Sequence, residues 1–240
     1  FGAVGNGSHD DTAAIQAALN SGAKKVIFPA GSYLVSSGLT IPDYLELQGI
    51  GFPVGVGTGS SSIPVQINAT QTSGVLLTCG EHPVIKNIYF NGSGSYNMTT
   101  HTLSGTTAYA ISVTGDINIE ECCFALWDTA IEIDSSYYIR TRSVEFNRCT
   151  YGYRNSGGSC YDVNIDTPTS RLTDIFFGGT GSAYTRNVKV YGGSVEGFSN
   201  IATHIQDISF FGTYFETDVE KTGAFCFDNL TNGSNVAIYG

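Results

Sequence analysis

The amino-acid sequence predicts an all-β solenoid, a stack of coils built from short parallel strands, with one short helix at its N-terminal end. Only 13% of the 240 residues are charged, while glycine occurs 30 times, tyrosine 14 times and phenylalanine 14 times. This composition favours short strands and tight turns over helices. An internal repeat indicates the same architecture, because residues 188–196 match residues 208–216 after a shift of 20 positions.

The first residues are expected to cap the solenoid. A glycine-rich loop over residues 1–9 can adopt positive φ angles at low steric cost. The Asp-Asp-Thr run at residues 10–12 favours a helix start and suits the positive end of a helix dipole. We therefore predict a helix at about residues 11–20, followed by a strand at residues 25–28.

The rest of the chain is expected to form the coils. Apolar residues alternate with polar ones, as in half-buried strands, at residues 33–35, 39–41, 45–47, 65–67 and 75–77. We predict a cap and first coil over residues 1–50 and β-helix coils over residues 51–240, in one continuous domain. Two polar stretches, residues 51–62 and 92–105, are predicted to be loops that are either functional or disordered.

Similar strand starts recur from residue 84 onward. One series contains Ile88, Ile119, Val144, Val163, Val188, Ile208 and Val236, whose separations range from 19 to 31 residues. A second series contains Ala110, Ala130, Gly152, Ile175, Ala202 and Ala224. This variation argues against leucine-rich and ankyrin arrays, whose repeats are more regular, and suits a β-helix whose turns accept insertions.

Stacking such coils about 4.8 Å apart pairs the backbone groups and aligns like side chains into ladders. We expect an aromatic stack and an aliphatic stack, formed by Phe90, Phe124 and Phe146 and by Val190, Phe210 and Ile238. A β-sandwich with the same strand content is the alternative fold.

The opening run, FGAVGNGSHDDTAAIQAALNSGAKKVIFPAGSYLV, resembles the start of the pectate-lyase-like superfamily of right-handed parallel β-helices. That superfamily includes polygalacturonases, fungal exo-glucanases and bacteriophage tailspikes, and this chain is closest in character to tailspike and tail-fibre proteins. Gly5-Asn6-Gly7 stands where the usual pattern has Gly-Asp-Gly. The resemblance implies a right-handed β-helix; its motif belongs to the cap and carries no activity.

Charge and cysteine content restrict the partners and the compartment. The net charge of −10 argues against nucleic acid or an anionic membrane as the main partner. No apolar run reaches 18 residues, so membrane insertion is not expected. The six cysteines, without any CxxC pair, are either core thiols or disulfides: Cys79, Cys122, Cys123, Cys149, Cys160 and Cys226. Reduced thiols indicate folding in a cytosol, as for a phage protein made inside a bacterium.

Two acids are the candidate catalytic residues. If the 20-residue match is correct, Glu196 and Glu216 stack about 5 Å apart, which is near the carboxylate separation of a retaining glycosidase. Their repulsion raises one pKa and supplies an acid beside a base; the alternative is a pair of solvated surface acids. Of the polygalacturonase motifs, only the Asn-x-Asp pattern at residues 164–166 is present. No metal ligand set and no cofactor are predicted.

Aromatic residues supply the candidate glycan contacts. Trp127, Tyr137 and Tyr151 are predicted to stack on sugar rings from the surface. The alternative is that such residues belong to ordinary strands with one ring inside and one outside.

Three functions fit these features. The first is a virion tailspike or tail-fibre domain that recognises bacterial surface polysaccharide, either with or without depolymerase activity. Such a domain is expected to form a homotrimer and to contact other virion tail proteins. The second is a secreted polysaccharide-degrading enzyme, either a glycoside hydrolase or a lyase. The third is a structural shaft without a ligand. We also expect the polypeptide to continue past Gly240, because residues 235–240 form an unpaired strand edge.

Overall fold

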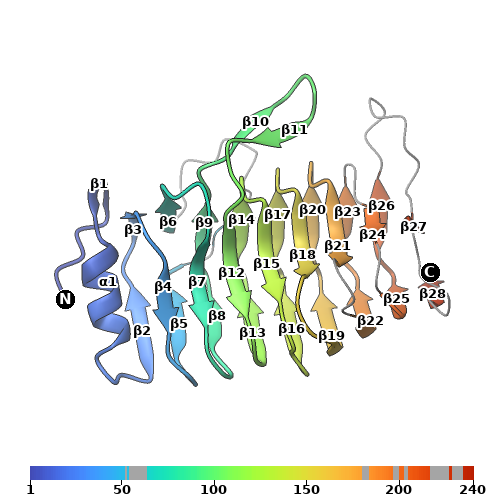
Figure 1. Ribbon diagram of the computed structural model, residues 1–240, viewed down its shortest axis with the longest axis horizontal. Coiled ribbons are helices and arrows are strands. Elements are labelled where there is room, and N and C mark those ends of the chain that lie inside the picture. Colours follow the sequence, from blue (N-terminus) through green and yellow to red (C-terminus); the bar gives the residue numbers. More distant parts are fainter. Residues whose placement is uncertain are drawn as a thin grey trace.

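The computed structural model describes residues 1–51, 53, 64–179, 184–196, 200–202, 205–216, 227–228 and 235–240. In this part of the chain the strands form three parallel sheets, A, B and C, wound into a solenoid (Figure 1). A strand of sheet B is followed along the chain by one of sheet A and one of sheet C, so three strands complete a coil. The predicted all-β, right-handed parallel β-helix with a short N-terminal helix is confirmed.

The sheets have these strands, in spatial order. Sheet A contains β1 (Asn6–Asp10), β3 (Gly31–Val35), β6 (Val65–Ala69), β9 (Tyr89–Asn91), β14 (Cys123–Ala125), β17 (Glu145–Asn147), β20 (Thr169–Arg171), β23 (Ser194–Glu196) and β26 (Tyr214–Glu216). Sheet B contains β2 (Lys25–Phe28), β5 (Glu46–Gly49), β8 (Val84–Lys86), β13 (Ile117–Glu120), β16 (Ile139–Arg142), β19 (Cys160–Asp166), β22 (Thr185–Tyr191), β25 (Asp207–Phe211) and β28 (Asn235–Tyr239). Sheet C contains β4 (Leu39–Ile41), β7 (Val75–Cys79), β12 (Tyr109–Val113), β15 (Thr129–Ile133), β18 (Tyr151–Asn155), β21 (Ile175–Gly179), β24 (Asn200–Ala202) and β27 (Phe227–Asp228).

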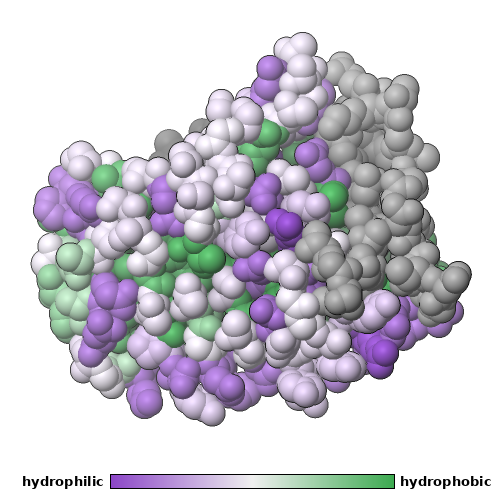
Figure 2. Space-filling model, in the orientation of Figure 1, coloured by the Kyte–Doolittle hydropathy of each residue, from purple (hydrophilic) through white to green (hydrophobic). Residues whose placement is uncertain are grey.

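The helix α1 (Thr12–Leu19) covers the N-terminal end of the solenoid, where the prediction placed it (Figure 1). Ile15 and Leu19, four residues apart, are its buried residues and pack into the core. Its other face is rich in alanine and contributes a pale apolar patch at the left of Figure 2. The helix therefore shields the apolar interior of the first coil from water.

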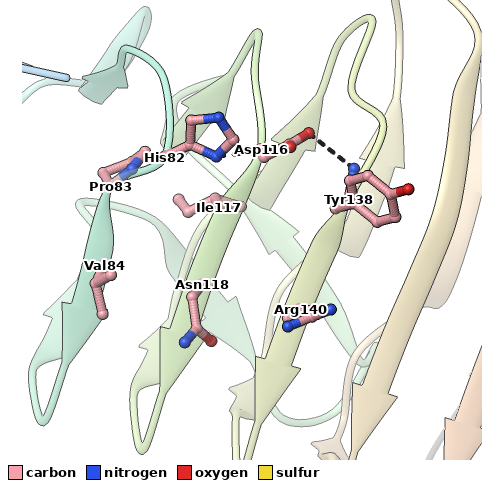
Figure 3. A pocket seen from close by; sticks show the side chains of 8 residues that line it. All are labelled: His82, Pro83, Val84, Asp116, Ile117, Asn118, Tyr138 and Arg140. Carbon is pink, nitrogen blue, oxygen red and sulfur yellow. Dashed lines mark hydrogen bonds and ion pairs between the residues drawn. The ribbon is translucent and has the colours of Figure 1, made fainter. Parts of the chain in front are cut away.

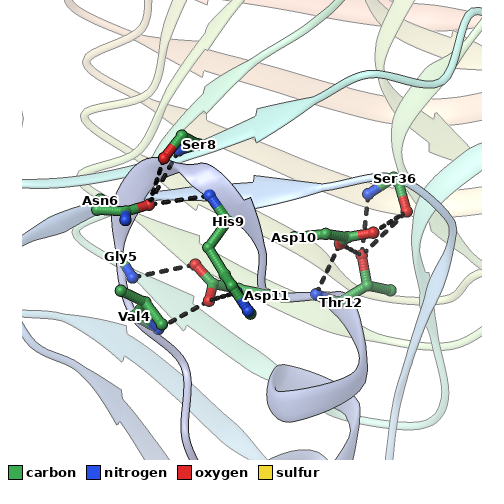
Figure 4. Close-up of polar contacts among 9 residues, drawn as sticks. All are labelled: Val4, Gly5, Asn6, Ser8, His9, Asp10, Asp11, Thr12 and Ser36. Carbon is green, nitrogen blue, oxygen red and sulfur yellow. Dashed lines mark hydrogen bonds and ion pairs between the residues drawn. The ribbon is translucent and has the colours of Figure 1, made fainter.

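The two acids before α1 bind neighbouring segments of the chain, and the carboxylate of the N-cap residue Asp11 does not cap the helix. The Asp11 carboxylate accepts hydrogen bonds from the backbone N–H groups of Val4 (2.7 Å) and Gly5 (3.0 Å). The Asp10 carboxylate accepts hydrogen bonds from the Thr12 N–H and from the Ser36 hydroxyl (Figure 4). Both carboxylates thus fasten the glycine-rich loop to the first coil.

The corners from sheet B to sheet A explain how strands of three residues can follow one another so closely. From β8 onward the described corners have two residues, and the first has a φ between 46° and 62°: Asn87, Glu121, Ser143, Thr167, Gly192 and Gly212. The left-handed residue turns the chain sharply, and the next side chain is buried, as at Ile88 and Val144. The corner N–H of Glu121 donates to Arg142 O on the next coil (2.8 Å), so the corners stack as well as the strands.

The core contains the predicted aromatic stack. Phe90, Phe124 and Phe146 pair in register in sheet A and are fully buried. Their ring centroids are 5.1 Å and 5.9 Å apart, with interplanar angles of 12° and 24°. Burying each such ring stabilises the fold by about 1.5–3 kcal/mol.

The C-terminal ladders also lie where the repeat predicts. Val188 pairs with Ile208 and Ile208 with Val236, and only Val236 is half-buried rather than buried. Val190, Phe210 and Ile238 are likewise in register, with Ile238 exposed on the last described strand.

Part of the predicted strand series is wrong, because it mixes two sheets. Ile88 and Val144 are corner residues that precede strands of sheet A, whereas Val163 belongs to sheet B. Ile119 is also in sheet B but pairs with Thr141 on the next coil, so it is not in the same rung as Val163. Apolar residues alternate in both sheets, and alternation alone does not identify the sheet.

The second series follows sheet C with two shifts, one of which is that Ile175 pairs with Asn200 rather than with Ala202. Ala110 and Ala130 share a rung, but the register places Ile175 opposite Tyr151 rather than Gly152. Ala202 lies in β24, and position 224 lies outside the described residues.

Both predicted loops can be compared with the structure only in part. Residues 92–105 are not an irregular loop, because β10 (Ser95–Asn97) and β11 (Thr102–Ser104) pair as an antiparallel hairpin that rises from the solenoid (Figure 1). Asn97 Oδ1 accepts the N–H groups of Thr99 (2.8 Å) and Thr100 (3.1 Å) and so closes the turn. Of residues 51–62, the structure describes only Gly51 and Pro53.

The cysteine prediction is confirmed for the described residues. Cys79, Cys122, Cys123, Cys149 and Cys160 are free and buried, and Cys226 lies outside the described part of the chain. Cys123 differs from the others, since it sits with Tyr89 and Ala125 in a separate apolar cluster on the outer side of sheet A. No helix in the described residues is both long and apolar enough to cross a membrane.

Candidate functional site

The outer side of sheet B carries a groove of about 300 Å³ near the corner where the chain enters from sheet C. It is lined by His82, Pro83, Val84, Asp116, Ile117, Asn118, Tyr138 and Arg140 (Figure 3). A second, mostly apolar groove of about 200 Å³ lies between α1 and β2, and the single side-chain hydroxyl among its lining residues, that of Tyr33, already donates to Pro29 O. Specific recognition needs a few placed polar groups among apolar ones, so the groove on sheet B is the candidate site.

Two stacked rings lie at one end of this groove, and His82 is the one that lines it. Tyr44 and His82 occupy corresponding corners of successive coils, and both have positive φ angles, 57° and 53°. Their ring centroids are 5.2 Å apart at an interplanar angle of 28°, and Tyr44 is 61% exposed. His82 Nδ1 lies 3.6 Å from Asp116 Oδ2, and Nε2 lies 3.8 Å from Glu81 Oε2, so a carboxylate lies near each ring nitrogen.

Asp116 also fixes the opposite wall. Its Oδ1 accepts the backbone N–H groups of Tyr137 (3.2 Å) and Tyr138 (2.8 Å; Figure 3). Tyr138 is 51% exposed, and its ring borders the groove. The Asp116 carboxylate therefore lies beside the His82 ring of one coil and holds the Tyr138 backbone of another.

The floor of the groove is a row of side chains in register. Val84, Asn118 and Arg140 lie side by side on β8, β13 and β16 (Figure 3). Asn118 Nδ2 donates to Glu120 Oε1 (2.8 Å). Among the described residues, no carboxylate forms an ion pair with Arg140. The floor can thus offer a guanidinium and an amide to a ligand that covers the tyrosine rings.

The neighbouring row of sheet B contrasts with this floor, because its charges are paired. Glu120 Oε2 lies 2.7 Å from Arg142 Nη2 and 3.6 Å from Lys86 Nζ. Burial disfavours the ionised form of Glu120, but hydrogen bonds from Arg142 and Asn118 outweigh it and lower the pKa of the carboxyl. These charges stabilise one another and leave Arg140 as the unpaired cation of the groove.

The prediction that Trp127 contacts sugars from the surface is wrong. Trp127 is 0% exposed, and its Nε1–H donates to the backbone oxygen of Phe90 at 3.0 Å. It lies in the corner between β14 and β15, where no alternation tells which side chain turns inward. Burial of its large ring and a satisfied indole N–H make it part of the core.

The other two predicted aromatic residues lie on the outside in different settings. Tyr137 is 65% exposed beside the groove and stacks on Tyr161 at 5.7 Å and 14°. Tyr151 is half-buried on sheet C, and the Arg154 guanidinium covers its ring at 4.9 Å. Arg154 also lies 3.4 Å from Asp128 Oδ2, so one face of Tyr151 is already occupied by a paired cation.

The predicted carboxylate pair lies on sheet A, away from the groove. Glu196 and Glu216 are register partners on β23 and β26, as the repeat predicts. Glu196 accepts a hydrogen bond from the Ser194 hydroxyl (3.0 Å) and lies 3.7 Å from Arg171 Nε, a cation that the sequence prediction did not include. The side chain of Glu216 lies outside what the structure describes.

Sequence reasoning missed Tyr44, His82, Asp116 and Arg140 as a group. One signal was available: Asp43-Tyr44 and Glu81-His82 are acid–aromatic pairs that occupy stacked corners, and Glu81 N donates to Asp43 Oδ1 at 2.8 Å. The insertion between the two pairs hid their correspondence. In the described part of the chain, no group of three or more His, Cys, Asp or Glu residues is placed to hold a metal ion.

Comparison with known proteins agrees with this fold. Residues 1–68 match the family model described as rhamnogalacturonase A/epimerase, pectate lyase-like. A stretch of 110 residues is 34% identical to the mannuronan C5-epimerase AlgE3 of Azotobacter vinelandii; it covers 44% of this chain and 6% of the epimerase.

Two solved structures share the architecture at low sequence identity. ORF18 of Geobacillus virus E2 has a TM-score of 0.58 at 16% identity, over 90% of this chain and 51% of that chain. PfbA, a surface adhesin of Streptococcus pneumoniae, has a TM-score of 0.50 at 12% identity, over 99% of this chain and 77% of that chain. The resemblance to the pectate-lyase-like family is therefore confirmed by sequence in residues 1–68, and the described coils share the parallel β-helix fold.

Proposed function

We propose that this protein recognises a polysaccharide along the outer side of sheet B, with the groove at His82 and Tyr138 as the principal contact. The observation that carries the proposal is the convergence of the exposed Tyr138 ring with the polar floor of Asn118 and Arg140, beside the stacked rings of His82 and Tyr44. Sugars present apolar C–H faces and many hydroxyl groups, and this combination of rings and hydrogen-bonding groups suits them.

The rigidity of the sheet supports the proposal. The floor side chains of the groove project from β8, β13 and β16, whose backbones are fixed by pairing with their neighbours. His82, Asp116 and Tyr138 lie in the corners that directly precede these strands. Coils repeat about every 4.8 Å, so the outer side presents equivalent positions at a constant spacing. An extended glycan also repeats at a constant spacing, and binding such a chain to a preorganised surface costs little ordering entropy.

The cellular setting that we propose is the tail of a virion, where the domain would bind bacterial surface polysaccharide as part of a homotrimer beside other tail proteins. The fold similarity to ORF18 of Geobacillus virus E2 and the free, buried cysteines support this setting. A secreted protein is the alternative location. Light scattering of the complete polypeptide tests the assembly, and a monodisperse monomer would refute the trimer.

The recognition proposal is tested by glycan-array binding and calorimetry with the bound polysaccharide. Tyr138→Ala is expected to weaken binding about tenfold, because the ring contributes stacking and covers the groove. Tyr214→Ala is the matched control, since Tyr214 is 60% exposed on sheet A. Equal losses in both variants, or no binding of any polysaccharide by the intact protein, would exclude the groove as the recognition site.

A polysaccharide-degrading or polysaccharide-modifying enzyme is the second candidate. It is favoured by the register pairing of Glu196 with Glu216 and by the sequence similarity to a mannuronan C5-epimerase. If these acids act in cleavage, Glu196→Gln and Glu216→Gln should each lower turnover by orders of magnitude and leave binding intact. Reducing-sugar release identifies a hydrolase and an unsaturated product identifies a lyase; unchanged turnover in both variants removes the pair from the mechanism.

A further inference from the structure

The row that forms the groove floor continues beyond the groove along sheet B. Val84, Asn118, Arg140, Asn164 and Lys189 are register partners on consecutive coils, from β8 to β22. We call this set the outer row. Its polar part alternates an amide with a cation, so the two cations are two coils, or about 10 Å, apart.

Neither cation of the outer row has a carboxylate partner among the described residues. On the same sheet, Lys25 pairs with Glu46 (3.0 Å) and Arg142 pairs with Glu120, whereas Arg186 also forms no ion pair but lies over the Tyr161 ring at 5.8 Å. Arg140 is exposed and Lys189 is half-buried. Both are therefore free to meet an anionic group from outside.

Carboxylates flank the outer row on both sides, and they restrict where a bound ligand can place its negative charges. On one side, Asp116 accepts backbone N–H groups, and Asp162 and Asp207 accept hydrogen bonds from the Asn187 and Asn235 amides. On the other side, Glu120 and Asp166 lie two residues further along the strands. These acids, and the net charge of −10, repel an anion that is not placed on a cation.

We propose that the outer row selects a polysaccharide that carries an anionic group on alternate sugars and runs parallel to the solenoid axis. The inference rests on the proposed recognition function and specifies its ligand. One extended sugar spans roughly one coil spacing of about 4.8 Å, so alternate sugars meet Arg140 and Lys189 while the sugars between them meet Asn118 and Asn164. An anion on every sugar would also face the amide positions and the flanking acids, which is unfavourable.

The test uses calorimetry at low salt, where exposed charges are least screened. The probes are hyaluronan oligosaccharides of about six sugars, which carry a carboxylate on every second sugar and span the outer row. Their carboxyl-reduced derivative is the neutral probe, and polygalacturonate of equal length carries a carboxylate on every sugar. We expect hyaluronan to bind about tenfold more tightly than either of the other two.

Variants separate the outer row from general charge effects. Arg140→Gln and Lys189→Gln should each weaken hyaluronan binding about two- to fivefold, and the double variant about tenfold. Arg142→Gln is the matched control, because it removes an exposed, paired cation from the same strand, and it should weaken hyaluronan binding less than Arg140→Gln does. Unchanged emission from the buried Trp127 verifies folding in every variant.

Four outcomes overturn the proposal. They are equal binding of the carboxyl-reduced probe, equal or tighter binding of polygalacturonate, an equal loss in Arg142→Gln, and the absence of hyaluronan binding when a neutral polysaccharide still binds through Tyr138. In the last case the recognition function stands and only the charge selection fails. If no polysaccharide binds at all, both fail together.

Discussion

At the scale of single residues, the buried carboxylate of Asp11 determines how the chain enters the solenoid. It is 0% exposed and accepts two backbone N–H groups, from Val4 and Gly5, while His9 Nδ1 lies 3.2 Å from Oδ1 (Figure 4). These donors come from the glycine-rich loop at the start of the chain. Hydrogen bonds to a charged acceptor stabilise the folded state more than hydrogen bonds to a neutral acceptor do.

Asp11→Asn should therefore lower the free energy of unfolding by about 2–3 kcal/mol, because the amide keeps one acceptor and turns an N–H donor toward another donor. Urea denaturation measures the change. Asp10→Asn is the comparison: Asp10 is exposed, and asparagine can still accept the Thr12 N–H, so only the contact with the Ser36 hydroxyl is weakened and the loss should be smaller. An equal effect of both substitutions would mean that the Asp11 contacts are not specific.

Trp127 gives the second prediction at this scale. It is the single tryptophan of the chain, it is fully buried, and it donates a hydrogen bond to Phe90 O. Its fluorescence should be blue-shifted, resistant to acrylamide quenching, and unaffected by a bound polysaccharide. Trp127→Ala should cost about 3–5 kcal/mol of stability because it leaves a cavity and removes the hydrogen bond of the indole. Quenching by polysaccharide would contradict the buried position.

At the scale of elements, the corners between sheets B and A limit stability. Six described corner residues have positive φ angles, and only two of them, Gly192 and Gly212, are glycines. Thr167 is the least suited, because a β-branched side chain at a φ of 46° crowds the backbone. The corner N–H of Thr167 donates to Tyr191 O at 2.7 Å, so the stacking of coils holds the strained residue in place.

Thr167→Asn should raise the free energy of unfolding by about 0.5–1 kcal/mol, because asparagine tolerates the left-handed region. The corresponding rise in melting temperature is about 1–4 °C for a chain of this size. Thr78→Asn is the matched control in an exposed strand position of β7, where asparagine is unfavourable, and it should lower stability slightly. A destabilised Thr167→Asn protein would show that the threonine side chain is required at the corner.

At the scale of the whole molecule, thiol burial makes stability depend on alkaline pH. Burial raises the pKa of Cys79, Cys122 and Cys149 to about 12, from an ordinary value of 9.0. Between pH 9 and 12 the thiols lose protons in the unfolded chain and keep them in the folded one. The unfolded state then binds fewer protons, so stability falls as the pH rises through this window.

We expect the free energy of unfolding to decrease by up to about 1.4 kcal/mol per pH unit for each such thiol above pH 9. Urea denaturation at pH 8, 9 and 10 measures the slope. Cys79→Ala should reduce the slope, although it is less stable at neutral pH because it leaves a small cavity. Thiol reagents should label the native protein slowly and the unfolded protein quickly, and fast native labelling would contradict the burial.

The sequence by itself determined the local and repeated features of this protein. The cap helix follows from a polar start and apolar residues four apart, and the pairing of Val188 with Ile208 follows from a direct 20-residue match. The stack of Phe90, Phe124 and Phe146 follows from strand alternation. Such features depend on neighbours in the chain or on similarity between adjacent coils, and both are visible in the sequence.

Only the tertiary structure decided which side chains share the groove and which enter the core. Trp127 lies in a corner, where the backbone has no alternating pattern and the direction of the side chain depends on a left-handed residue, Leu126 (φ 64°). Tyr44 and His82 meet because coils of unequal length still stack at one spacing. The physical reason is that backbone pairing fixes the rise per coil, whereas insertions change the number of residues per coil, so spatial neighbours lose any constant separation in the sequence.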